Sequence, residues 1–317
     1  MSKVRGRTVR LFLVDGSQNG LLTAEIINWT GHVLISPRDS IGEALKREEA
    51  SRTGLYFLVG QDPEQPSKVK VYIGEADVVA ERIKMHAKDE SKDFWTRACF
   101  VTSKDPNITK AHVRYLESRL VEMTRISGRA NLANGNDPSP KVLPESDVAD
   151  MEFFLEQIEL ILPVVGFDFL RPLPLPSVQP LPPSAEKFGQ AIDVSGDPPP
   201  GLEFVISSKK YGLEAHAIGF GELFVVLKGS GALADEFTHN SYRALRQQLI
   251  ADGRLKPGPT SQLLQFDENV DFQSPSAAAA VIFNRNTNGR TAWKIKGSDM
   301  TLKDWQDAQL NQVILNE

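Results

Sequence analysis

The pattern of apolar and polar positions predicts a small sheet at the start of the chain. An apolar run at residues 9–14 is typical of a strand that ends at Asp15-Gly16. Residues 22–29 predict a second strand, which the turn signal Thr30-Gly31 ends. We interpret the two strands as a small sheet that covers the segment after them.

A β-hairpin is predicted next, from strands at residues 54–59 and 68–73 with a proline-containing loop between them. In both strands apolar side chains alternate with others, which places Tyr56 and Tyr72 away from the most apolar faces. We therefore expect the two tyrosines on one side of the hairpin.

Helical periodicity follows in four segments. The expected helices cover residues 40–51, where Ser40 and Glu43 have capping-box spacing, 77–88, with Asp77 as N-cap, 109–126 and 148–162. A strand at residues 98–102 separates the second helix from the third. Arg82 and His86 are four residues apart in the second helix, so they face the same direction.

One acidic residue interrupts the apolar stripe of the third helix. Glu117 lies beside Leu116 and one turn from Val113 and Val121. A carboxylate in such surroundings is partly desolvated unless a positive charge meets it. Glu117 is therefore a candidate functional residue, and an ion pair with Arg114 or with a cation on a strand is the structural alternative.

A proline-rich segment separates two halves of the chain. We expect residues 1–50 to form an N-terminal extension, residues 51–162 a central module, and residues 163–185 a linker. Within the linker, Arg171-Pro172-Leu173-Pro174-Leu175-Pro176 predicts stiff polyproline II. Residues 186–317 predict a separate domain, and the expected fold class is α+β for both halves.

The second half contains segments of both kinds. Strands are expected at residues 202–207, 213–218, 223–227 and 291–295, and helices at residues 240–251 and 274–283. Ser274 is the expected cap of the last helix, with Pro275 at its first position. Asn288-Gly289 is a typical hairpin turn. We find no metal-ligand spacing, phosphate loop or nucleophile motif in this half.

Composition limits the class of protein. A chain of 317 residues fits two domains, and its single cysteine, Cys99, excludes an intramolecular disulfide and favours a reducing, cytoplasmic setting. No apolar run has the length of a membrane span, so no membrane partner is expected. The net charge of −5 argues against a broad basic coat, although a local basic surface remains compatible with it.

Two tripeptides in the hairpin carry a resemblance. Gly54-Leu55-Tyr56 and Tyr72-Ile73-Gly74 precede Arg82, His86 and Glu117 in that order. Together they resemble the GIY-YIG nuclease family over residues 52–136, with Leu55 where that family has isoleucine. The segment from about Arg243 to Trp305 is similar to a small domain of unknown function that often follows bacterial GIY-YIG modules.

The resemblance implies a catalytic module with a small antiparallel sheet flanked by helices. It implies an endonuclease that hydrolyses phosphodiester bonds in DNA, most readily duplex DNA, with Mg²⁺ or Mn²⁺. Glu117 would hold the metal, and Arg82 would grip the scissile phosphate. Tyr56, Tyr72 and His86 would activate and position the water, and the choice of general base among them stays open.

The resemblance also implies an asparagine after the glutamate. Either Asn131 or Asn134 could fill this position, and we assign Asn134 to it. Restriction, phage-defence and mobile-element roles all fit such an enzyme.

Four basic residues place positive charge near the proposed site. They are Lys84, Lys88, Lys92 and Arg97, and we expect them to contact nucleic acid. Two alternatives remain: a catalytically inactive nucleic-acid-binding or assembly module with the same fold, and a nuclease directed at RNA. An oligomer is compatible with each.

Overall fold

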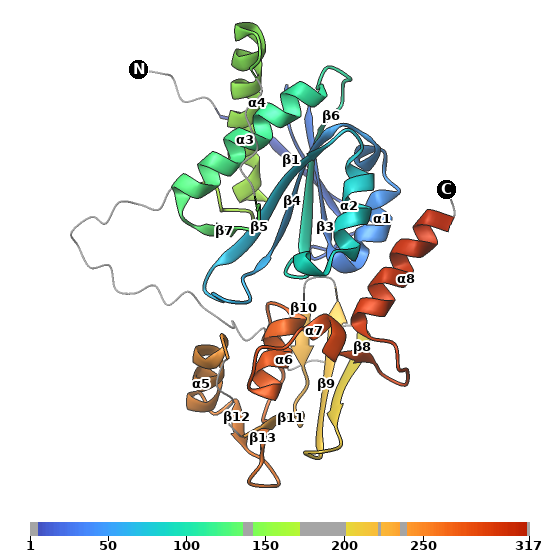
Figure 1. Ribbon diagram of the computed structural model, residues 1–317, viewed down its shortest axis with the longest axis vertical. Helices are drawn as coiled ribbons and strands as arrows, with labels where there is room; N and C mark the ends of the chain where they lie inside the picture. The colour runs from blue at the N-terminus through green and yellow to red at the C-terminus, as the bar shows by residue number, and fades with distance from the viewer. Residues whose placement is uncertain (1–5, 136–141, 172–200, 221–222, 235–239, 316–317) are drawn as a thin grey trace, which may run out of the picture. The chain divides into compact units, whose positions relative to one another are not determined.

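The protein has an α+β fold in a computed structural model that describes residues 6–135, 142–171, 201–220, 223–234 and 240–315 (Figure 1). The chain divides into two compact units. The first comprises residues 1–62, 68–175 and 310–317, and the second comprises residues 63–67 and 176–309. No helix in the described part of the chain is long and apolar enough to cross a membrane.

A seven-stranded sheet forms the centre of the first unit, with the strand order β1-β2-β3-β6-β4-β5-β7. Its strands are β1 (Val9–Leu13), β2 (Leu22–Ile26), β3 (Gly31–Pro37), β4 (Gly54–Gln61), β5 (Val69–Ala76), β6 (Arg97–Ser103) and β7 (Ala130–Leu132). Neighbouring strands are antiparallel except β5 and β7, which are parallel.

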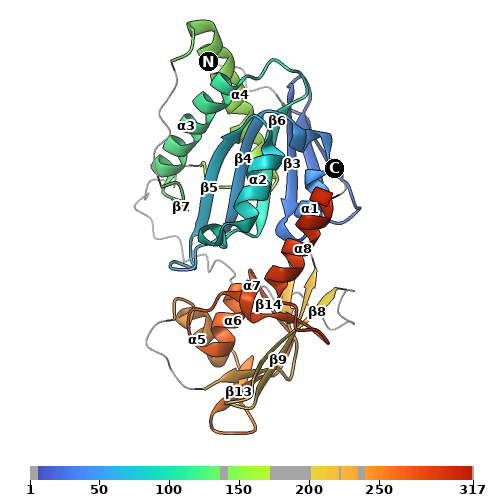
Figure 2. The same ribbon diagram turned by 45° about the vertical axis from the view of Figure 1, so that its right-hand side comes forward.

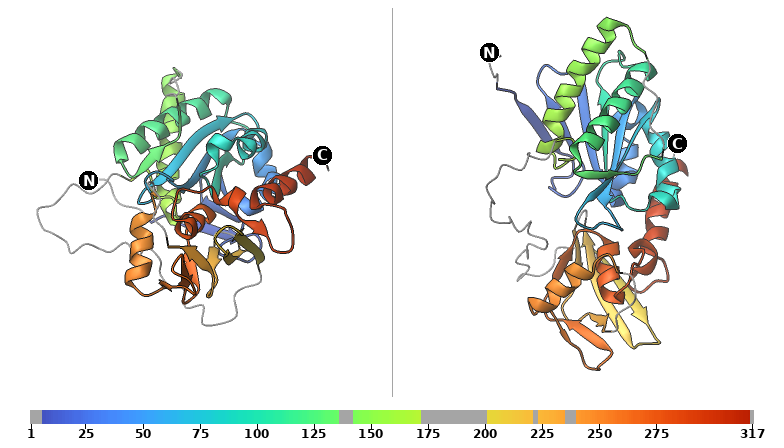
Figure 3. Two further views of the ribbon diagram at one scale, coloured as in Figure 1. Left: turned by 60° about the horizontal axis from the view of Figure 1, so that its bottom comes forward. Right: turned by 60° about the vertical axis from the view of Figure 1, so that its left-hand side comes forward.

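Helices cover both faces of this sheet (Figure 2). The helices α3 (Lys110–Ser127) and α4 (Glu145–Val164) pack side by side on one face (Figure 3). On the other face lie α1 (Ile41–Leu45), α2 (Val79–Lys88) and the short 3₁₀ turns Arg38–Ser40, Glu48–Ser51 and Glu90–Lys92. Because strand side chains alternate, Leu55 and Phe57 of β4 point to α3 and α4, and Tyr56 points to α2.

Three expectations for this half are wrong. The first strands do not form a separate small sheet, because β3, which we did not predict, pairs with β6 along its whole length and joins them to the hairpin. The helix expected at residues 40–51 ends at Leu45, and Ser40 makes no capping bond. Asp77 does not cap α2, because the helix begins after Val78 and Asp77 pairs with Lys110 instead.

The second unit contains a five-stranded antiparallel sheet with the order β14-β10-β9-β8-β15 and a three-stranded sheet with the order β11-β13-β12. Its strands are β8 (Leu202–Ser208), β9 (Leu213–Phe220), β10 (Leu223–Val226), β11 (Gly231–Leu233), β12 (Leu255–Pro257), β13 (Leu263–Phe266), β14 (Val270–Phe272) and β15 (Lys294–Ile295). The helices are α5 (Arg243–Ala251), α6 (Pro275–Phe283), α7 (Gly289–Ala292) and the first part of α8 (Leu302–Leu315), whose residues from Leu310 belong to the first unit. The alanine-rich α6 is buried in the core, and Ser274 caps it as expected.

The predicted hairpin at Asn288-Gly289 is wrong. Asn288 caps the short helix α7, and a Cβ atom at Gly289 would lie 2.2 Å from the backbone of Pro275. Glycine is required there for close packing of α7 on α6, not for a turn. The predicted polyproline segment lies outside the described residues except for Arg171.

Candidate active site

Three aromatic side chains meet on the α2 face of the sheet. The hydroxyl of Tyr56 lies 2.8 Å from Nε2 of His86. The ring of Tyr72 packs edge-on against His86, with 4.9 Å between ring centroids, and its centroid is 6.0 Å from that of Tyr56. The expected shared side of the hairpin is therefore present, and it faces α2.

Gly74 makes this arrangement possible. Gly74 is the cross-strand partner of Tyr56 in the β4–β5 pair. A Cβ atom at Gly74 would lie 2.3 Å from both Cζ and the hydroxyl oxygen of Tyr56. The glycine of the second tripeptide thus leaves the space that the tyrosine of the first tripeptide fills.

Burial controls the ionisation of the Tyr56–His86 pair. It raises the pKa of Tyr56 far above its ordinary value, and the neighbouring Tyr72 acts in the same direction while Arg82 lowers it. Burial, with the charges of Lys92 and Arg82, lowers the pKa of His86 to about 4. At neutral pH both groups are therefore uncharged, and a ring nitrogen of His86 is available as a proton acceptor.

Arg82 connects the aromatic group to the acid on α3. The Arg82 side chain is exposed on α2, one turn before His86. Its charge lowers the pKa values of Tyr56, His86 and Glu117. An exposed guanidinium with this reach is well placed to bind a phosphate that lies between the two sides of the site.

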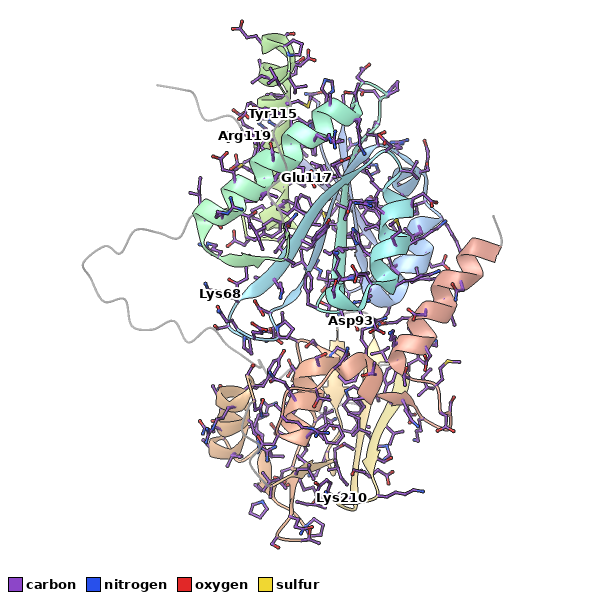
Figure 4. The ribbon with its side chains drawn as sticks, in the orientation of Figure 1. Lys68, Asp93, Tyr115, Glu117, Arg119 and Lys210 are labelled. Atoms are coloured by element: carbon purple, nitrogen blue, oxygen red, sulfur yellow. The ribbon has the colours of Figure 1, made fainter. Side chains whose placement is uncertain are left out.

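Glu117 lies on the face of α3 that is turned to the sheet, whereas Tyr115 and Arg119 are turned to α4 and contact Glu152 (Figure 4). Burial, followed by the negative charge of Glu75, raises the pKa of Glu117 to about 7. Arg114, Lys110 and Arg82 act in the opposite direction. Among the described residues, none forms a hydrogen bond or ion pair with the Glu117 carboxylate.

Glu75 is a second acid that the sequence analysis missed. It follows Gly74 directly, and its carboxylate contacts Lys110 (2.7 Å from Nζ) and Arg114 (3.6 Å from Nε) of α3. The alternation of β5 could have indicated it, because Glu75 follows Val71 and Ile73 on the face that packs against α3.

The two candidate asparagines have different neighbours. Nδ2 of Asn134 donates to the carbonyl oxygen of Ile73 (2.7 Å), and its Oδ1 accepts the Ile73 N–H (3.1 Å). Nδ2 of Asn131 donates to Asp62 (2.7 Å) at the far end of the hairpin. Asn134 is thus the asparagine that holds the second tripeptide.

In the described part of the chain, the site lies beyond the end of the β5–β7 ladder, where no strand pairs with the outer edge of β5. The ladder between β7 and β5 includes only Val69, Lys70 and Val71. Beyond it, the Asn134 carboxamide takes the place of a strand at Ile73. Around this edge, Glu117 on the α3 face and Arg82 on the α2 face can approach each other.

The four predicted basic contacts have different surroundings. Lys84 pairs with Glu81 (3.5 Å), and Lys92 pairs with Asp89 (2.9 Å) and lies over the Tyr72 ring. Lys88 is exposed at the end of α2. Arg97 lies apart from the tyrosines: its guanidinium stacks over Phe167 and donates to the carbonyl oxygen of Val165, on the α4 side.

The donor set fits a hard divalent cation held largely by water and substrate. No group of three or more His, Cys, Asp or Glu side chains suited to a metal occurs in the described part of the chain. Glu117 nevertheless offers a partly desolvated carboxylate that has no hydrogen-bond or ion-pair partner among the residues that the structure describes. Mg²⁺ requires little more from a protein, because it keeps several waters and takes phosphate oxygens as ligands.

Comparison with known proteins bears on the second unit. Residues 204–306 match a family described as a domain of unknown function, DUF4357. The match covers about a third of the chain and begins well before Arg243, where we had expected the similarity to start. No curated protein and no solved structure matches the chain.

Proposed function

We propose that residues 52–136 form a GIY-YIG-type nuclease module that hydrolyses phosphodiester bonds in DNA with Mg²⁺ or Mn²⁺. The observation that carries the proposal is the convergence of the Tyr56–His86 pair and Tyr72 on one side of Gly74, with Arg82 acting electrostatically on both this group and Glu117.

Each side chain has a distinct task in this proposal. Glu117 holds the cation, which when bound neutralises phosphoryl charge and stabilises the 3′ leaving oxygen. Arg82 binds the scissile phosphate through its planar fork. Asn134 keeps the backbone around Tyr72 in place.

Water activation uses a relay rather than an ionised tyrosine. Tyr56 is fully buried and its pKa is raised, so it remains neutral at physiological pH. The Tyr72 hydroxyl receives the proton of the attacking water and passes its own proton to the neighbouring Tyr56 hydroxyl, and Tyr56 passes its proton to Nε2 of His86. Both tyrosines stay neutral, and His86 becomes an imidazolium. Tyr72, which is only half-buried, is the tyrosine that meets the substrate side.

Metal-dependent nicking of a supercoiled plasmid tests the proposal. The wild type should nick in Mg²⁺ or Mn²⁺, and Arg82→Ala should lose about a hundredfold in rate, the usual effect of removing one transition-state donor. Glu117→Gln should be inactive. Glu122→Gln, the same change on an exposed position of α3 that pairs with Arg119, is the matched control.

An inactive wild type in both metals would favour the binding-module alternative. Parallel assays on single-stranded DNA and RNA identify the preferred target.

A further inference from the structure

Two cations on α3 lie beside Glu117 and have no role in the proposed chemistry. Nζ of Lys110 lies 2.7 Å from Glu75 and 3.1 Å from Asp77, and Nε of Arg114 lies 3.6 Å from Glu75. Both charges act on Glu117. A positive strip therefore continues from the candidate metal ligand toward the start of α3.

Their exposure distinguishes these cations from Lys84 and Lys92, two of the residues that we first expected to bind nucleic acid. The side chains of Lys110 and Arg114 are 40% and 54% exposed, against 11% for Lys84 and 18% for Lys92. The Arg114–Glu75 separation of 3.6 Å is also too long for a hydrogen bond. Arg114 can therefore turn toward a ligand at little cost, whereas Lys110 exchanges its contacts with Glu75 and Asp77 for the ligand.

Helix stability does not account for a cation at Lys110. It is the first residue of α3, and the first turn contains no acidic side chain. Positive charge at this end opposes the helix dipole. Glu75 and Asp77, which are outside the helix, supply the compensating negative charge.

We infer that Lys110 and Arg114 bind backbone phosphates next to the scissile position, and that Glu75 is an internal counter-anion that these phosphates displace. The inference rests on the proposed nuclease function and extends it by naming the strip along which the nucleic acid lies. The inference predicts that removing the Glu75 charge increases the affinity for nucleic acid, because it frees the two cations.

Fluorescence anisotropy of a labelled duplex measures its affinity for the protein. EDTA prevents cleavage, and the measurement is repeated over a series of salt concentrations. Lys110→Gln and Arg114→Gln should each reduce the slope of log Kd against log salt by about 0.9, the effect of one lost phosphate contact. Arg119→Gln removes the same charge on the α4 side of the helix and should leave the slope unchanged.

Glu75→Gln should tighten binding by up to about fivefold, a factor that an ion pair with an exposed cation can account for. Asp77→Asn should act in the same direction through Lys110. Glu122→Gln removes an equal charge elsewhere on α3 and should have a smaller effect. Thermal unfolding of each variant identifies any that fail to fold.

Wild-type salt slopes in Lys110→Gln and Arg114→Gln would overturn the inference, and so would weaker binding by a folded Glu75→Gln. The outcome is independent of the nicking assay. Salt-dependent binding with the expected slopes but no cleavage would keep this inference and reject the nuclease activity. Cleavage by the wild type, together with unchanged salt slopes in the two variants, would keep the nuclease activity and reject this inference.

Discussion

The Tyr56 hydroxyl and Nε2 of His86 lie 2.8 Å apart, and neither group is charged at neutral pH. In the proposed relay this contact passes the proton on. Tyr56→Phe should therefore reduce kcat by about a hundredfold or more, because general acid–base steps contribute at least that much. Tyr115→Phe, which loses a hydroxyl bonded to Glu152 on the other side of α3, is the control. Equal rates in the two variants would rule out a relay through Tyr56.

Gly74 should tolerate no side chain. In Gly74→Ala the new methyl group would overlap the Tyr56 phenol, which is held by the sheet and by His86. We expect a loss of about 1–3 kcal/mol in the free energy of unfolding and a larger loss of activity. At Gly135 a Cβ atom would meet nothing within 4 Å, so Gly135→Ala should behave as wild type. Urea unfolding and nicking rates check both variants, and a fully active Gly74→Ala would contradict the geometry.

Alanine variants of Asn134 and Asn131 should both lower stability, and only one of them should lower activity. Each alanine variant loses partly buried hydrogen bonds and should be destabilised by about 0.5–1.5 kcal/mol. Only Asn134→Ala releases Ile73, so only this variant should lower kcat when both are assayed well below their unfolding temperatures. The assignment of Asn134 fails if Asn131→Ala is impaired to the same degree.

Glu117 should make stability depend on pH when no metal is present. Its pKa is about 7 in the folded protein and near 4.5 in an unfolded chain. Between these values the folded state keeps a proton that the unfolded state has lost, so the free energy of unfolding falls as pH rises. Glu117→Gln should be more stable than wild type by roughly 1–2 kcal/mol at pH 8, after solvent screening, and equal to it near pH 4. Urea unfolding in EDTA measures the difference, and identical pH profiles would contradict it.

The same carboxylate should make metal affinity depend on pH. A cation binds the ionised form, so the affinity for Mn²⁺ should increase as pH rises through about 7 and then level off. Electron paramagnetic resonance reports free Mn²⁺ directly. A pH-independent affinity, or one that Glu117→Gln retains, would contradict the proposed ligand.

The hairpin could be predicted from the sequence, and the alternation within each strand led us to expect Tyr56 and Tyr72 on one side of it. The register between the two strands, which fixes this shared side, comes from the structure. The long helix was predictable for a similar reason, since its apolar stripe isolates Glu117. The α+β class follows from the same patterns.

Other features depend on contacts between distant segments. The continuity of the sheet rests on β3, whose residues include Gly31 and Pro37 and carry no clear alternation signal. The choice between Asn131 and Asn134 requires the register of β7 against β5. The role of Glu75 depends on which turn of α3 lies over it, and spacing alone does not predict this.

The most direct test of metal-dependent hydrolysis is cleavage of a duplex oligonucleotide in isotopically labelled water, followed by mass analysis of the ends. The proposed mechanism predicts 3′-hydroxyl and 5′-phosphate products, one labelled oxygen in each new phosphate, and no product from Glu117→Gln. An uncut duplex in both Mg²⁺ and Mn²⁺, or unlabelled phosphate ends, would contradict the mechanism.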